Sequence, residues 1–361
     1  MEQKSDHSAH LYASEPMWTT PRILRIGLLL LILGASNGVA EERRFERAER
    51  QMGTKFSIQL YSESEQQAHQ AFESAFARIQ QLNEILSDYR ADSEISRLSA
   101  PSTNGPERQV SDALWEVLSR GQQISRMSEG AFDMTLGPVT TLWRDSRRSR
   151  QLPDRQSLQQ AIESTGYRNL RLIESPRSVS LTRPGMRLDL GGIAKGFALD
   201  EAMIELKRVG IQRALINGGG DLIASEPPPD ARGWRIGLVG LSDDAPPSEF
   251  VWLANLAIAT SGDLWQFVEI DGVRYSHLIN PKTGIGLTQS SSVTVIAPTA
   301  MDADAIASAV SVLGPKDGLK LLKRHPRFDG RIVHKQGGAP TVLMTQGFEA
   351  LVDSQPPAEA D

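Results

Sequence analysis

Apolar residues recur along the chain with two periods, and the order of these periods predicts how the chain folds. Residues 56–60 are apolar at every second position, as in a strand with one buried face. Residues 62–88 carry apolar side chains at helical spacing, and similar patterns predict helices over 111–130 and 153–166. A polar break at 87–93 ends the first of these helices.

The second half of the chain continues this mixture. Helices are expected over 191–210 and 301–313, and a basic helix follows to residue 325. Strands are expected at 179–181, 187–190, 213–216, 250–260, 292–297, 331–334 and 341–344. Because strands and helices do not alternate strictly, we expect an α+β fold with mixed or antiparallel sheets and packed helices. No shift in composition marks a boundary, so we expect two intimately associated lobes.

The first forty residues have the layout of a secretory signal peptide. A basic segment at 22–25 precedes an apolar run at 26–33, and small residues follow up to Ala40, which suits removal of 1–40. The apolar run is much shorter than the roughly 20 residues that span a bilayer. A start at Met17 would give a basic segment of more usual length. We therefore expect an exported protein, with an uncleaved anchor as the alternative interpretation.

Composition excludes several kinds of chemistry. The 361 residues are 40% hydrophobic and 23% charged, so residues 41–353 suit a globular unit, followed by a disordered tail at 354–361. A net charge of −5 gives no reason to expect nucleic acid as a partner. The absence of cysteine excludes disulfides, thiolate metal sites and cysteine catalysis.

Asp304 and Ser308 lie four residues apart on an expected apolar helix, so both side chains face the same way. Their oxygens suit Mg²⁺, which takes few protein ligands and completes its shell with water and substrate phosphate. Asp302 resembles a cap or first-turn acid. A carboxylate among alanines, as at Asp304, is costly unless it meets a cation. The pair predicts a magnesium site that handles phosphate.

Three glycine-containing turns have the chemistry of anion sites. Residues 188–200 read as a strand, a glycine turn and a helix start, where Lys195 adds a positive charge. Residues 217–221 allow close approach of the backbone, and residues 260–263 add two hydroxyls at a strand end. None of them matches a Walker A loop or a dinucleotide fingerprint. Each taken alone has an ordinary structural interpretation as a turn.

His277 is expected at the end of a strand, just before a Pro/Gly turn at 280–284. A lone histidine is more often structural than catalytic, but its polar neighbours favour a functional role. It is a candidate base or phosphate contact.

Met52 and Tyr89 are candidates for contact with a flat ring system. Methionine sulfur is polarisable and tyrosine stacks, so together they suit the two faces of such a ring. Each has an ordinary core or surface interpretation as well.

Taken together and in this order, eight segments resemble the ApbE family, the FAD:protein FMN transferases. No single segment decides the resemblance, which extends over about residues 52–347. The segments are 52–54, 86–98, 130–138, 189–200, 217–221, 260–263, 277–284 and 302–308.

The resemblance implies a Mg²⁺-dependent periplasmic enzyme with FAD as its substrate. Such an enzyme cleaves the FAD pyrophosphate, attaches FMN through a phosphoester to a Thr or Ser of a partner flavoprotein and releases AMP. The implied partners are redox proteins in or at the membrane, such as electron-transport subunits. An uncleaved signal would anchor the protein in the inner membrane.

The resemblance also implies site residues. Mg²⁺ would be held by Asp304, Ser308 and the carbonyl of Ala194, and His277 and Asp304 are the candidate catalytic residues. The implied flavin contacts are Met52, Tyr89, Ala131, Asp133, Lys195, Thr260, Ser261, Gly262, His277 and Thr283.

These contacts are distributed along FAD. Met52 and Tyr89 would flank the isoalloxazine ring. Asp133 and its neighbours would face the adenosine end. Lys195 and the turn at 260–262 would serve the pyrophosphate.

The chain departs from the family pattern at a few positions. Asn280 stands where the family usually has Asp, and Lys282 where it commonly has Arg. Ser308 replaces a usual Thr, and Met134 replaces Pro or Ile. Two other functions use the same residues and remain open. One is an FAD pyrophosphatase that gives FMN and AMP, and the other is a flavin-binding protein without catalysis.

Overall fold

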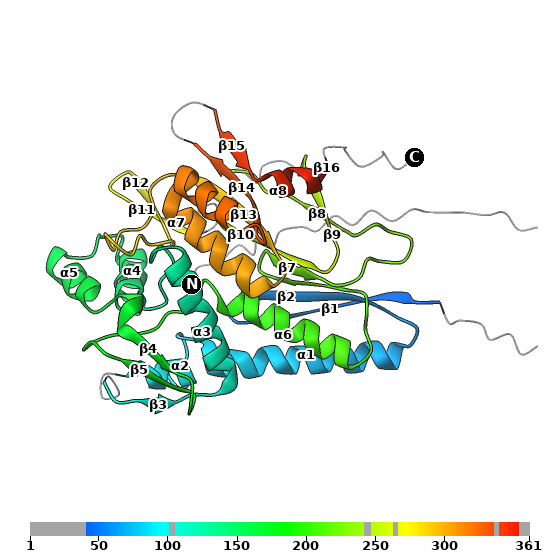
Figure 1. The fold of residues 1–361 in the computed structure, drawn as a ribbon, viewed down its shortest axis with the longest axis horizontal. Helices are drawn as coiled ribbons and strands as arrows, with labels where there is room; N and C mark the ends of the chain where they lie inside the picture. The colour runs from blue at the N-terminus through cyan, green and yellow to red at the C-terminus, as the bar shows by residue number, and fades with distance from the viewer. Residues whose placement is uncertain (1–40, 101–104, 242–246, 263–265, 336–338, 354–361) are drawn as a thin grey trace, which may run out of the picture.

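A computed structural model describes residues 41–100, 105–241, 247–262, 266–335 and 339–353. At its centre is an eight-stranded sheet in the order β1–β2–β6–β7–β10–β13–β14–β15 (Figure 1). All seven ladders of this sheet are antiparallel. The strands are β1 (Arg43–Gln51), β2 (Thr54–Ser62), β6 (Ala214–Gly218), β7 (Asp221–Ala224), β10 (Leu256–Gly262), β13 (Ser291–Ala297), β14 (Asp329–His334) and β15 (Thr341–Met344).

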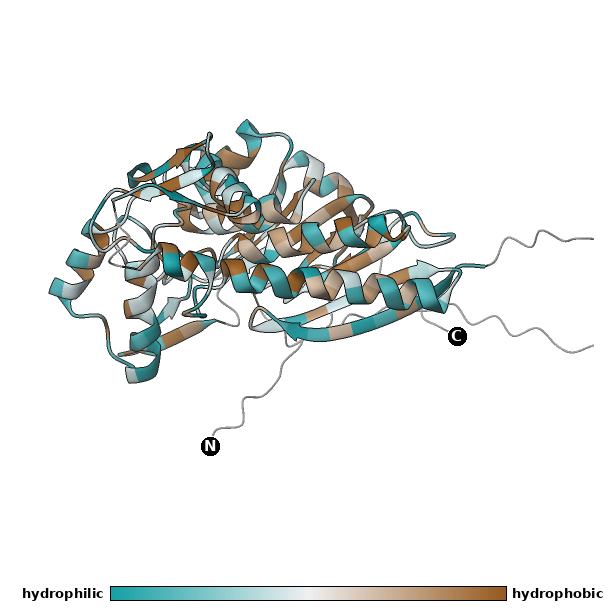
Figure 2. Cartoon of the chain, turned by 90° about the horizontal axis from the view of Figure 1, so that it is seen from below, coloured by the Kyte–Doolittle hydropathy of each residue, from teal (hydrophilic) through white to brown (hydrophobic). Residues whose placement is uncertain are grey.

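Three long helices cover one face of this sheet: α1 (Glu65–Leu86), α6 (Ala194–Arg208) and α7 (Ala300–Arg324) (Figure 1). Figure 2 shows hydrophilic and hydrophobic residues mixed along the long helices. The pattern in α1 is that of a helix with one buried face, whereas α7 is buried on all sides from Ala300 to Ser311. Within α7, Gly314 has φ +76° and precedes Pro315, so the helix is kinked there. The kink explains why the sequence pattern predicts two helices in this region.

A smaller layer packs on the opposite face. It contains β8 (Trp234–Gly237), β9 (Phe250–Leu253), β16 (Val352–Asp353) and α8 (Gln346–Leu351). The Trp234 and Phe348 side chains are buried there against Leu222 and Ile258 of the central sheet. The sheet is therefore covered on both faces.

The second lobe holds further helices and two small sheets (Figure 1). Its elements are α2 (Glu94–Leu98), β3 (Arg108–Gln109), α3 (Asp112–Met127), α4 (Gly137–Ser149), α5 (Arg155–Glu163), η2 (Tyr167–Asn169), β4 (Leu170–Ile173), β5 (Ser178–Leu181), β11 (Phe267–Ile270) and β12 (Val273–Ser276). Leu118 of α3 and Val179 of β5 belong to the same buried cluster as Ile79 of α1. This shared core confirms the α+β fold with two closely associated lobes.

One expected strand is wrong, and another is two strands. Residues 187–190 form a loop, with a single β-bridge from Arg187 to Leu136. They do not join a sheet because the Leu188 N–H donates to the Ser99 hydroxyl at 3.0 Å and the Asp189 N–H donates to the Met134 carbonyl. Residues 250–260 divide into β9 and β10 at a turn. The structure also contains β1 and α4, which the apolar pattern does not predict because both are rich in charged or polar residues.

The expected signal peptide at 1–40, residue Asp263 and the expected tail at 354–361 lie outside the described residues. Among the residues described, no helix combines the length and apolar character needed to cross a membrane. The domain boundaries at 40 and 353 stay predictions.

Candidate functional site

The start of α6 forms one wall of the candidate site. The Asp189 carboxylate accepts a hydrogen bond from the Gly191 N–H at 2.8 Å and so shapes the turn before the helix. The backbone of Gly192 lies against α7, since a β carbon there would stand 3.0 Å from Ser308 Oγ. The side chain of Ile193, the residue before α6, does not cap the helix, and the Gly196 N–H in the first turn is bonded instead to a carboxylate of α7.

Asp304 and Ser308 face the start of α6 from α7, and both side chains are buried. The Asp304 carboxylate accepts a hydrogen bond from the Gly196 N–H at 3.2 Å. The Ser308 hydroxyl lies 3.3 Å from the hydroxyl of Ser261 on β10. Oxygen atoms from two elements therefore meet the N-terminus of a third.

Lys195 lies between two buried acids. Its Nζ atom forms an ion pair with Asp221 and lies 3.7 Å from Asp304 Oδ2. Burial alone would lower the pKa of Lys195, but the carboxylates of Asp221 and Asp304 outweigh it and the pKa is raised. Burial raises the pKa of Asp304, against the opposing effect of Lys195. The ammonium is thus a shared counter-ion for two carboxylates.

Asp221 is a residue of this site that the sequence pattern does not single out. It begins β7, directly after the glycine turn in which Gly219 has φ +74° and Gly220 has φ +102°. The Asn217 side chain accepts a hydrogen bond from the Gly220 N–H at 2.9 Å, which fixes the turn. The only signal in the sequence is an acid at the return of a glycine-rich hairpin.

The two hydroxyls of β10 point to opposite faces of the sheet, as neighbouring strand residues do. Ser261 faces α7, whereas the Thr260 hydroxyl lies 3.0 Å from the hydroxyl of Thr294 on the other face. Gly262 pairs with Ser292 in the ladder, where a β carbon would stand 2.9 Å from a main-chain oxygen of β13. Only one of the two hydroxyls therefore joins the Asp304 site.

His277 follows β12, at the strand end where the sequence places it. Its ring Nδ1 lies 3.1 Å from the carbonyl oxygen of Gln266, and its N–H donates to the same oxygen at 2.9 Å. A carbonyl oxygen only accepts, so Nδ1 carries the hydrogen and Nε2 is the basic nitrogen. The histidine is thereby tied to the segment that follows β10.

The turn after His277 is held by its own side chains and by α4. The Asn280 side-chain oxygen accepts a hydrogen bond from the Lys282 N–H at 2.9 Å, and Thr283 Oγ1 accepts from the Ile285 N–H at 3.3 Å. Trp143 Nε1 donates to the Gly284 carbonyl at 2.7 Å. An aspartate at position 280 could accept the same hydrogen bond, so the departure at Asn280 is compatible with this turn.

The two expected ring contacts lie near the same end of α1. Met52, with φ +48°, is in the turn between β1 and β2 and lines a pocket of about 330 Å³ with Asn83 of α1. Tyr89 follows α1 by three residues, and its side chain is exposed. Arg144 of α4 stands 4.0 Å from the centre of the Tyr89 ring.

Asp133 is occupied by its own loop. Its carboxylate accepts hydrogen bonds from the Thr135 N–H at 2.8 Å, the Thr135 hydroxyl at 2.6 Å and the Tyr167 N–H at 2.9 Å. Burial raises the pKa of Asp133, and these three donors oppose the effect. Ala131 is half-buried in the same loop, and a β carbon on Gly192 would stand 3.4 Å from the Phe132 ring. The loop lies beside the start of α6.

Asp302 has the structural role expected of it. It lies in the first turn of α7, and its buried carboxylate is paired with Arg120 at 2.5 Å and Arg327 at 2.9 Å. Asp200 of α6 also holds this end, because its carboxylate accepts from the Ala300 and Met301 N–H groups at 2.7 and 2.9 Å. These contacts fix α7 beside α6.

Comparison with known proteins identifies the family. The model of the ApbE family matches residues 52–332. This chain belongs to the ApbE family.

Curated relatives and solved structures of ApbE proteins match nearly the whole described chain. The FAD:protein FMN transferase of Treponema pallidum is 33% identical over 328 residues, which cover 86% of this chain and 90% of the relative. The FAD:protein FMN transferase of Haemophilus influenzae is 27% identical, over 84% of this chain and 90% of the relative. The flavinyl transferase ApbE of Pseudomonas stutzeri, in its apo form, superposes with a TM-score of 0.77 at 29% identity, covering 87% of this chain and 98% of that one. The flavin transferase ApbE of Vibrio cholerae superposes with a TM-score of 0.78 at 27% identity, covering 86% of this chain and 99% of that one.

The donor set of this ApbE chain fits a hard divalent cation. Asp304 and Ser308 offer oxygen ligands, and no group of three or more His, Cys, Asp or Glu side chains that could hold a metal occurs within the described ranges. Further ligands would be carbonyls, water or phosphate. Ala194 is the first residue of α6, whereas Gly192 is the residue whose backbone lies directly against Ser308.

Proposed function

We propose that this chain is an FAD:protein FMN transferase that uses Mg²⁺, attaches FMN to a Thr or Ser of an acceptor flavoprotein and releases AMP. The observation that supports this best is the meeting of Asp304, Ser308 and Lys195 at the start of α6. Transfer at a pyrophosphate needs positioning and charge neutralisation more than covalent help from the protein. A helix N-terminus, an ammonium and a pair of hard oxygen ligands supply both.

Asp304 and Ser308, with a main-chain carbonyl of the turn before α6, would hold the metal. When bound, Mg²⁺ supplies Lewis acidity and orientation at the pyrophosphate. Lys195 is anchored by Asp221 and so keeps its charge beside the phosphates. The Ser261 hydroxyl is a further donor to phosphate oxygens, and the N-terminus of α6 adds the positive end of its dipole.

His277 is the proposed base for the acceptor hydroxyl. Its Nδ1–H is directed at the Gln266 carbonyl, which leaves Nε2 as the nitrogen that takes a proton. A metal-linked carboxylate, Asp304, is the alternative base. The proposed acceptors are redox proteins of the membrane electron-transport chain. The proposed location is the periplasm, which the sequence pattern of residues 1–40 supports.

The test combines two readouts. The mature protein is incubated with FAD and Mg²⁺, with and without a candidate periplasmic acceptor domain, and AMP and the intact mass of the acceptor are measured. A mass gain of one FMN that disappears when Mg²⁺ is chelated supports the transferase. Free FMN and AMP without an adduct on any acceptor would support the pyrophosphatase, and bound but unchanged FAD would support a flavin carrier.

A further inference from the structure

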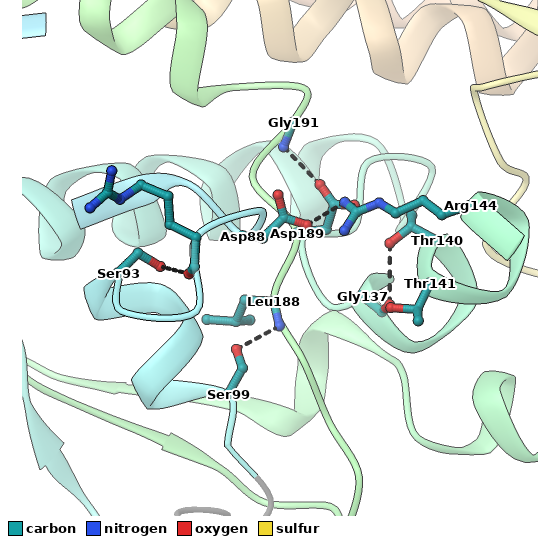
Figure 3. Close-up of polar contacts among 11 residues, drawn as sticks. Asp88, Ser93, Ser99, Gly137, Thr140, Thr141, Arg144, Leu188, Asp189 and Gly191 are labelled. Atoms are coloured by element: carbon teal, nitrogen blue, oxygen red, sulfur yellow. Dashed lines mark hydrogen bonds and ion pairs between the residues drawn. The ribbon is translucent and has the colours of Figure 1, made fainter. Parts of the chain in front are cut away.

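A polar network connects the exposed ring of Tyr89 to the turn that opens α6; Figure 3 shows the acids and the arginine of this network. Arg144 forms an ion pair with Asp88, and its Nη2 atom lies 3.5 Å from Asp189 Oδ2. The same guanidinium stands 4.0 Å from the centre of the Tyr89 ring. One side chain of α4 thus contacts three residues from two other segments.

The network has a direct link to the proposed phosphate site. While one oxygen of Asp189 lies near Arg144, the other accepts the Gly191 N–H at 2.8 Å in the turn before α6. Figure 3 shows Asp189 between Arg144 and Gly191. The position of the ring is therefore tied to the position of the helix start.

Exposure and charge indicate what the network is for. The Tyr89 residue is 76% exposed, while the side chains of Asp88, Asp189 and Arg144 are 15%, 16% and 26% exposed. A tyrosine ring this open offers area on which a planar group can stack. A planar guanidinium on an aromatic ring restricts the ring through a cation–π contact.

Without Arg144 the two acids would repel one another. Burial and the neighbouring Asp189 raise the pKa of Asp88, and the ion pair with Arg144 opposes this. The guanidinium therefore has two roles that the ammonium of lysine shares only in part. It neutralises the acids, and it presents a flat surface to the ring.

We propose that Arg144 is a positioning residue for flavin binding. It holds the Tyr89 ring in the orientation that stacks on a planar ring of FAD, and it fixes that ring relative to the α6 turn that receives the pyrophosphate. The inference rests on the proposed function, because it takes FAD as the ligand.

The test is a double-mutant cycle on FAD affinity, measured by flavin fluorescence titration of the whole protein. Arg144→Met and Tyr89→Ala should each weaken FAD binding by about tenfold. Adding Arg144→Met to Tyr89→Ala should cause no further loss, because Arg144 acts through the ring. Arg144→Lys should restore part of the affinity. Arg148→Met is the matched control, because Arg148 lies about one turn after Arg144 on α4 and is paired with Asp145 at the surface; this variant should bind FAD as the wild type does.

Two results would overturn the proposal while leaving the proposed function intact. One is an undiminished FAD affinity in Arg144→Met, and the other is a loss that adds fully to that of Tyr89→Ala. If Arg144→Met does not fold, Arg144→Lys replaces it in the cycle. Its effect on FAD affinity is then compared in the presence of Tyr89 and in the Tyr89→Ala variant, and a smaller effect is expected. A wild-type protein that does not bind FAD would overturn the proposed function and this inference together.

Discussion

The ammonium of Lys195 on α6 lies 3.7 Å from the carboxylate of Asp304 on α7. The two helices come this close because Gly196 follows the lysine, at the point where α6 meets the main chain at the start of α7. A cation, an acid and a helix N-terminus are thereby brought together where two helices cross. The proposed chemistry depends on how tightly these helices cross.

Gly196→Ala should therefore destabilise the protein. A β carbon at this position would collide with the Ala300 carbonyl, and main chain cannot move aside cheaply. We expect a loss of about 1–3 kcal/mol in the free energy of unfolding, as for overpacked sites. Urea unfolding measures it. The control is Gly240→Ala, because a β carbon there meets no atom within 4 Å. Equal stability of the two variants would contradict the close crossing.

Lys195→Met should expose the repulsion between Asp221 and Asp304. Removing one partner from a buried ion pair typically costs about 3–5 kcal/mol. Loss of the lysine also removes the effect that opposes burial at Asp304, so the pKa of Asp304 in the folded state lies further above its unfolded value. The free energy of unfolding of Lys195→Met should therefore approach that of the wild type as the pH falls from about 7 to about 5, because the folded variant gains protons in that range.

The matched control for this experiment is Lys320→Met on α7, whose ammonium pairs with Asp317 at the surface. Surface pairs contribute about 0–1 kcal/mol, so its stability should follow the wild type at each pH. A Lys195→Met deficit that does not depend on pH would mean that the two acids do not share the lysine.

Asp200 should make stability depend on pH. Burial raises its pKa from its ordinary value of 3.8 to about 7, although the Ala300 and Met301 N–H groups oppose the shift. Between these pH values the folded state binds more protons than the unfolded state, so stability falls as the pH rises through the window. Asp200→Asn should flatten this fall. Urea unfolding across that range measures it, and an unchanged slope in the variant would assign the pH dependence to another group.

Asn280→Asp tests the departure from the family pattern. A carboxylate can accept the Lys282 N–H as the amide does, so the stability change should stay within about 0.5 kcal/mol. Asn280→Ala removes the acceptor and should cost about 1 kcal/mol. If the residue only forms the turn, Asn280→Asp should turn over FAD at the wild-type rate. A large gain in rate would show that an acid here takes part in the chemistry.

The sequence predicts the centre of the candidate site better than its surroundings. Asp304 and Ser308 can be paired from the sequence because helix geometry alone places residues four apart on one face. The partnership of Lys195 with Asp221 cannot, because it depends on how the β6–β7 hairpin lies beside α6. Arg144 is unremarkable in the sequence for the same reason, since its partners come from two distant loops.

Two further differences between prediction and structure have physical causes of their own. Thr260 and Ser261 are adjacent, so both can be read as phosphate contacts, but alternation sends their side chains to opposite faces of β10. Residues 187–190 alternate charged and apolar side chains as a strand does, yet the N–H groups of Leu188 and Asp189 are bonded to a hydroxyl and a loop carbonyl. Local pattern does not encode such tertiary partners.

The most direct measurement is the rate of AMP release from FAD as a function of Mg²⁺ concentration, for the wild type, Asp304→Ala and Asp317→Ala. Asp317 lies on the same helix and is exposed, so its loss should leave the rate unchanged. Asp304→Ala should lose roughly two to three orders of magnitude in rate and its response to Mg²⁺, while still binding FAD. Wild-type turnover with an unchanged Mg²⁺ dependence in Asp304→Ala would contradict the proposed metal site.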